Sequence, residues 1–103
     1  MSDRLRYRTL VETDEYTAQR DAILAKYSED VIGGPLNGLL WGIATNPDQY
    51  DRATANIYQA VSRVFGLTIP VLRIFFGIEN RGTDNEHVLL LWIEEVEEIL
   101  RSL

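Results

Sequence analysis

The sequence predicts a small α+β domain in the order β-α-α-β-β-β, with an antiparallel sheet packed by two N-terminal helices and a short C-terminal helix. In the first half of the chain, apolar residues recur at helical spacings of three and four, and in the second half they alternate with a period of two. The helical spacing returns at the C-terminal end. The 103 residues, 46% of them hydrophobic, are enough for one core, so residues 1–103 are expected to form a single domain.

The chain is expected to begin with a strand and a helix. Residues 5–11 alternate apolar and polar side chains, which is typical of a strand with one face in the core. Asp14 can then cap a helix whose apolar positions continue to about Tyr27, with acidic residues at the positive end of its dipole.

A second helix is expected after the segment Gly33-Gly34-Pro35, which predicts a plain turn between the helices. Pro35 is tolerated in the first turn of that helix because its missing N–H would have no intrahelical acceptor there. The apolar face of this helix is expected at Leu36, Leu39, Leu40 and Ile43. It should end before Asn46-Pro47, because the residue preceding a proline is pushed out of the α region, and a polar loop should follow through residue 55.

The second half of the chain predicts three strands. Along residues 57–65 the side chains alternate with a period of two, and residues 71–78 are mostly β-branched and aromatic. Residues 80–85 have the composition of a turn. Residues 87–93 form a nearly continuous apolar run, as expected of a strand in the middle of a sheet. After this strand the three- and four-residue spacing of apolar positions predicts that the last ten residues form a short amphipathic helix, with Glu94, Glu97 and Glu98 on its solvated face.

Composition excludes several classes of function. The chain has no cysteine, one histidine and none of the usual nucleotide, hydrolase or zinc motifs, so we expect no metal and no cofactor. It has neither a signal peptide nor a long apolar stretch, so a cytoplasmic protein without a membrane segment is expected. The net charge of −6 argues against nonspecific nucleic-acid binding, although residues 52–82 carry four arginines against one acid.

Arg73 is the most informative candidate for a functional residue, because it lies inside an apolar strand. Its guanidinium must either reach solvent or pair with an acid such as Glu79 or Asp51. In the preceding strand, the alternation places Arg63 on the corresponding side, so antiparallel pairing could bring both arginines to one exposed surface of the sheet. They would then be either paired structurally with acids or available to bind an anion.

Three segments carry a resemblance to a known family. They are a helix ending in Asn46-Pro47, the strand Leu72-Arg73-Ile74-Phe75-Phe76-Gly77-Ile78 and the strand Val88-Leu89-Leu90-Leu91-Trp92-Ile93. In this order of elements, the chain resembles the RelE/ParE superfamily of bacterial toxins from type II toxin–antitoxin systems. The resemblance implies a small toxin bound by an antitoxin protein, with Arg73 and Arg63 at the positions of the family's strand arginines.

Two activities are known in that superfamily, and both stay open. RelE-like members cleave messenger RNA on the ribosome without a metal, and ParE-like members inhibit DNA gyrase. A nuclease would use Arg63 and Arg73, with Tyr58 or His87 as further candidates. The nucleases end in a basic stretch, whereas this chain has glutamates after residue 93, which would repel phosphate.

The sequence therefore predicts a toxin-family protein that acts mainly by binding an antitoxin or a cellular target such as gyrase. The first alternative is a metal-independent, ribosome-dependent endoribonuclease. The second is a non-toxic, homo-oligomeric binding module. In a homodimer, the interface would be the apolar stripe formed by Ile93, Val96, Ile99, Leu100 and Leu103.

Overall fold

The computed structural model describes residues 7–63 and 68–96, which form two helices and a five-stranded sheet. The elements are β1 (Thr9–Glu12), α1 (Asp14–Tyr27), α2 (Glu29–Thr45), a short 3-10 helix (Pro47–Gln49), β2 (Asp51–Arg52), β3 (Tyr58–Val61), β4 (Leu72–Glu79) and β5 (His87–Glu95). The sheet order is β1-β5-β4-β3-β2. The predicted α+β class is confirmed, and the 3-10 helix and the two-residue β2 occupy the segment expected to be a polar loop.

The first helix has the predicted extent, but its N-cap is Thr13 and not Asp14. The Thr13 Oγ1 accepts a hydrogen bond from the backbone N–H of Tyr16 at 3.3 Å and donates one to the carbonyl of Leu90 at 2.8 Å. A single hydroxyl therefore both caps α1 and ties its start to β5.

The predicted break at residues 33–35 is wrong, because α2 runs through it from Glu29. The chain turns earlier, at Ser28, whose φ of 77° lies in the left-handed region. Pro35 lies inside the helix, where it removes one backbone hydrogen bond. Burial of Ile32 before the glycines and Leu36 after them keeps this segment helical, so packing overrides local propensity. The predicted end of α2 before Asn46 is confirmed.

The sheet is mixed and not antiparallel as predicted. β4 pairs antiparallel with β3 and β5, but β1 pairs parallel with β5, with Thr9 opposite His87. An alternating pattern indicates which face of a strand is buried, but it carries no information about its neighbour or direction. β5 does lie between two strands, as its apolar run predicts.

The helix predicted for the last ten residues is wrong at its beginning, since Glu94 and Glu95 continue β5 beyond Ile93. Ile93 is opposite Ile74 in the ladder, and the backbone N–H of Val96 donates to the carbonyl of Val71 at 2.8 Å. Burial of Ile93 inside the sheet accounts for the difference. Residues 97–103, where the rest of this helix was predicted, lie outside the described residues.

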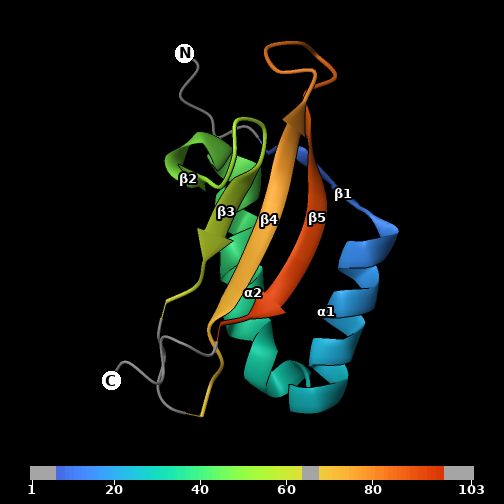
Figure 1. The fold of residues 1–103 in the computed structure, drawn as a ribbon, viewed down its shortest axis with the longest axis vertical. Coiled ribbons are helices and arrows are strands. Elements are labelled where there is room, and N and C mark those ends of the chain that lie inside the picture. The colour runs from blue at the N-terminus through green and yellow to red at the C-terminus, as the bar shows by residue number, and fades with distance from the viewer. Residues whose placement is uncertain (1–6, 64–67, 97–103) are drawn as a thin grey trace.

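Both helices pack on one face of the sheet (Figure 1), and no described residue forms a covering layer on the other face. On β4, Leu72, Ile74 and Phe76 point into the core and are fully buried. From the helices, the core receives Tyr16, Ile23, Ile32, Leu36, Leu39 and Ile43. The outward positions of the strands, in contrast, reach solvent and make up the surface described next.

Candidate functional site

The uncovered face of the sheet carries an apolar surface, which we call the open face. Two cross-strand rows run across it, Gln59–Phe75–Trp92 and Val61–Arg73–Glu94, and Val11 lies opposite Leu89 on the β1 side. Val61 is 42% exposed, Val11 39% and Trp92 38%. Apolar side chains gathered on an uncovered face, with a tryptophan among them, are typical of a surface that binds a protein.

Arg73 lies on this open face and is paired. Its Nε and Nη2 donate to one carboxylate oxygen of Glu94, at 2.9 and 2.6 Å, and its guanidinium lies 5.5 Å from the Phe75 ring. The other oxygen of Glu94 accepts from the indole N–H of Trp92 at 3.3 Å. An acidic partner was expected, but the suggested partners Glu79 and Asp51 are wrong, because Glu94 continues β5 directly opposite Arg73.

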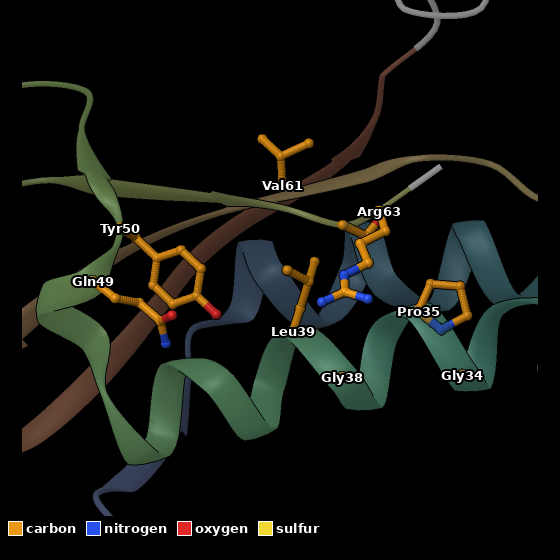
Figure 2. A pocket seen from close by; sticks show the side chains of 9 residues that line it. Gly34, Pro35, Gly38, Leu39, Gln49, Tyr50, Val61 and Arg63 are labelled. Atoms are coloured by element: carbon orange, nitrogen blue, oxygen red, sulfur yellow. The ribbon is translucent and has the colours of Figure 1, made fainter. Parts of the chain in front are cut away.

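Arg63 does not share that face. It lies two residues beyond the end of β3, is exposed, and lines a cavity between α2 and β3. Figure 2 shows its guanidinium directed toward α2, whereas Val61 points to the opposite side of the strand. The structure therefore does not place Arg63 and Arg73 side by side.

Tyr58 is buried in β3 and stacks on Phe76, with 5.4 Å between ring centroids. Its hydroxyl accepts a hydrogen bond from the Nη2 of Arg81 at 2.6 Å, and the guanidinium of Arg52 lies 5.3 Å from its ring. The three residues line a cavity of about 370 Å³, which Glu79 also lines. Tyr58 thus sits between two arginines that come from separate elements.

Arg81 in this cluster is also held by an acid. Its Nη1 lies 2.7 Å from Asp48, and that hydrogen bond raises the pKa of the guanidinium. In the sequence, Arg52 and Arg81 stand out only as part of a local excess of positive charge, and nothing there connects them to Tyr58. The sequence shows more arginines than acids in residues 52–82, which was the available sign of a basic cluster. The sheet register then brings the cluster together, because Arg52 lies opposite Tyr58.

His87 begins β5 opposite Glu79, and its Nδ1 lies 2.8 Å from the carbonyl of Asn85. It lines a separate open cavity of about 460 Å³ with residues of the turn before β5. Neither Tyr58 nor Arg63 lines this cavity.

The four predicted site residues therefore lie at four positions. Tyr58, Arg63 and His87 each line a different cavity, and Arg73 lies on the open face. Cleavage of RNA by its own 2′-OH needs a base, an acid and a cation around one phosphate. The described residues do not gather the four candidates around one such point.

Metal-ligand clusters and membrane-spanning helices are both absent from the described residues. Within residues 7–63 and 68–96, no group of three or more histidine, aspartate or glutamate side chains is placed to hold a metal ion. Over the same residues, neither helix combines the length and the apolar character needed to cross a membrane.

Comparison of the chain with families of known proteins, with characterised proteins and with solved structures finds no match. The resemblance to the RelE/ParE superfamily therefore stays a prediction from the sequence.

Proposed function

We propose that this chain is a protein-binding domain and that the open face of its sheet is the binding surface. The observation that carries the proposal is the exposure of Trp92 and Val61 on an uncovered sheet. Aromatic and aliphatic side chains that can be buried by a partner supply most of the free energy of association in protein interfaces. The Arg73–Glu94 pair between them offers polar groups that fix the orientation of a partner.

Charge favours a basic partner over a second copy of the chain. The chain carries a net charge of −6, so two copies repel one another, whereas a basic protein is attracted from a distance. This argument weighs against the homodimer expected as an alternative. Sedimentation velocity at rising concentration is the direct check, and a concentration-dependent dimer would contradict the preference.

In its narrower form, the proposal is that the chain is the toxin component of a RelE/ParE-like system and works in the bacterial cytoplasm. Its partner is then an antitoxin protein or a cellular target such as DNA gyrase. This form is supported by the segments that carry the resemblance and by the α+β class, with two helices between the first two strands of the chain.

The endoribonuclease is the second candidate, and one observation favours it. Arg52 and Arg81 lie within 6 Å of the Tyr58 ring, at 5.3 and 5.9 Å, and such a group can contact a phosphate. Against this candidate, Asp48 already pairs with Arg81, and Arg63, Arg73 and His87 lie elsewhere.

The test is expression of the chain in bacteria, with growth and messenger RNA integrity followed in the same cultures. Trp92→Ser removes the aromatic group of the open face, and Trp41→Ser is the matched control, because Trp41 is 52% exposed on α2. We expect growth arrest with intact messages, lost with Trp92→Ser and kept with Trp41→Ser.

Other outcomes would redirect the proposal. Fragmented messages that become intact on changing Tyr58 to Phe or Arg81 to Gln would establish the nuclease instead. Arrest that survives Trp92→Ser would exclude the open face as the toxic surface, and no arrest by the wild-type chain would reject the narrower form.

A further inference from the structure

We propose that the cavity between α2 and β3 binds a small organic carboxylate, an anion with an apolar body, and that Arg63 anchors its charge. This cavity is on the helix side of the sheet and is distinct from the open face. The inference is therefore independent of the proposed function.

The cavity has the size and the walls of a small-molecule site. Its volume is about 460 Å³, and Pro35 and Leu39 of α2 form apolar walls. Gly34 and Gly38 lie on the same stretch of helix, and a Cβ built on either would meet no atom within 4 Å. Sites of about 300–1,000 Å³ with apolar walls and a few polar groups are typical of ligand binding.

Among the described residues that line the cavity, Arg63 is the only charged one. Figure 2 shows its guanidinium reaching in between Leu39 and Pro35. In the part of the chain that the structure describes, Arg63 makes no ion pair and no side-chain hydrogen bond, in contrast to Arg73 and Arg81. One cation with free donors is complementary to one negative charge, and the planar fork of a guanidinium matches a carboxylate.

Tyr50 supplies a second donor on the other side of Leu39 (Figure 2). Burial raises the pKa of its hydroxyl, which therefore stays protonated at neutral pH. This hydroxyl has no hydrogen-bond partner among the described residues. The other polar groups are engaged, since the Gln49 amide donates to the Gly42 carbonyl at 3.3 Å and the Ser62 hydroxyl accepts from the Leu72 N–H at 2.9 Å.

The arrangement of these groups defines the class of ligand. A guanidinium and a neutral hydroxyl flank an apolar patch, so both oxygens of a carboxylate can be satisfied while the hydrocarbon part covers Leu39 and the glycines. A phosphate dianion would need a second cation, which this cavity does not supply among its lining residues.

The probe is 3-phenylpropionate, titrated into the isotope-labelled full chain while the backbone amide signals of Gly34 and Gly38 are followed by NMR. We expect saturable shifts of these signals, with a dissociation constant on the order of a millimolar for so small a ligand. The uncharged 3-phenylpropionamide should bind at least about tenfold more weakly, because it cannot pair with the guanidinium.

Two variants locate the site. Arg63→Gln should weaken binding at least about tenfold, and Gly38→Val should abolish it by filling the cavity. Arg20→Gln is the control, since Arg20 lies on α1, pairs with Glu12 and does not line this cavity, and it should leave binding unchanged.

Four results would overturn the inference, and three of them come from the titrations with the probe, its amide and the variants. These are the absence of saturable shifts at Gly34 and Gly38, equal binding of the acid and the amide, and binding that survives both Arg63→Gln and Gly38→Val. Inorganic phosphate that competes as well as the probe would also overturn it, because the apolar body would then contribute nothing.

Discussion

The guanidinium of Arg73 and the carboxylate of Glu94 face each other across two antiparallel strands, and two donors of the arginine converge on one oxygen of the glutamate. The second oxygen is then available to the indole of Trp92. The pair thus holds the charged and the aromatic part of the open face in one arrangement.

We predict that this ion pair contributes only modestly to stability. The side chains of Arg73 and Glu94 are 30% and 35% exposed, and water screens such pairs. A double-mutant cycle with Arg73→Met and Glu94→Gln should give a coupling energy of about 0.5–1 kcal/mol from urea unfolding. Methionine keeps the apolar stem over Phe75. A coupling above about 2 kcal/mol would show that the pair has a structural role that its exposure does not suggest.

Trp92 and Ile93 are neighbours on β5, and we predict that substitution of Ile93 destabilises the fold much more than substitution of Trp92. Ile93 is 1% exposed and contributes to the core, so Ile93→Ala should lower the free energy of unfolding by about 2–5 kcal/mol. Trp92 points outward, and Trp92→Ser should lower it by no more than about 1 kcal/mol. Denaturant unfolding of both variants checks this, and equal losses would mean that the open face is covered in the folded chain.

Gly42 and Gly38 lie one turn apart on α2, and alanine should act in opposite directions at the two. A Cβ on Gly42 would collide with the hydroxyl of Tyr50, so Gly42→Ala should destabilise by about 1–3 kcal/mol. At Gly38 a Cβ meets nothing, and Gly38→Ala should stabilise by about 0.5–1 kcal/mol through better helix propensity. Thermal unfolding measures both effects. Adding Tyr50→Phe to Gly42→Ala should recover part of the loss, and no recovery would place the cause elsewhere.

Tyr16 should make the fold lose stability in alkaline solution. Burial raises its pKa to about 12, from the ordinary value of 10.0. The folded state therefore favours the protonated phenol, so this contribution is complete below pH 10 and is lost as the pH rises toward 12. The difference in unfolding free energy between the wild-type chain and Tyr16→Phe should shift by on the order of 1–3 kcal/mol over that range.

The control for this prediction is the same comparison at neutral pH. The Tyr16 hydroxyl is buried and forms no hydrogen bond within the described residues, so Tyr16→Phe should be nearly neutral or stabilising there. A difference between the two chains that does not change with pH would show that the phenol keeps an ordinary pKa.

Local sequence patterns were sufficient to predict the helices and strands whose bounds depend on neighbouring residues. The helix from Asp14 to Tyr27, the end of the second helix before Asn46-Pro47 and the apolar run of β5 follow from periodicity and proline geometry. The break at Gly33-Gly34-Pro35 failed for the opposite reason. There, burial of Ile32 in the core outweighs the low helix propensity of the segment, and the local sequence pattern does not show which residues the fold will bury.

The surfaces could be anticipated only in part. That Arg73 needs an acidic partner follows from its apolar neighbours, but the partner itself depends on the register of β4 with β5, which a bulge shifts between Phe75 and Phe76. Arg63 was expected beside Arg73, yet it lies past the end of β3 and turns toward α2. The clusters around Tyr58 and Arg63 arise from residues far apart in sequence, so they become visible only in three dimensions.

The parallel pairing of β1 with β5 also has a consequence during synthesis. Residues 9–12 pair with residues 87–90, so β1 has no strand to join until β5 has been made. Contacts of such large sequence separation are slow to form because a long loop must close first. On the ribosome, α2 can pack on β3 and β4 once these strands exist, but α1 lies mainly against β5. The apolar face of α1 therefore stays uncovered, and open to aggregation, until residues 87–95 have been made.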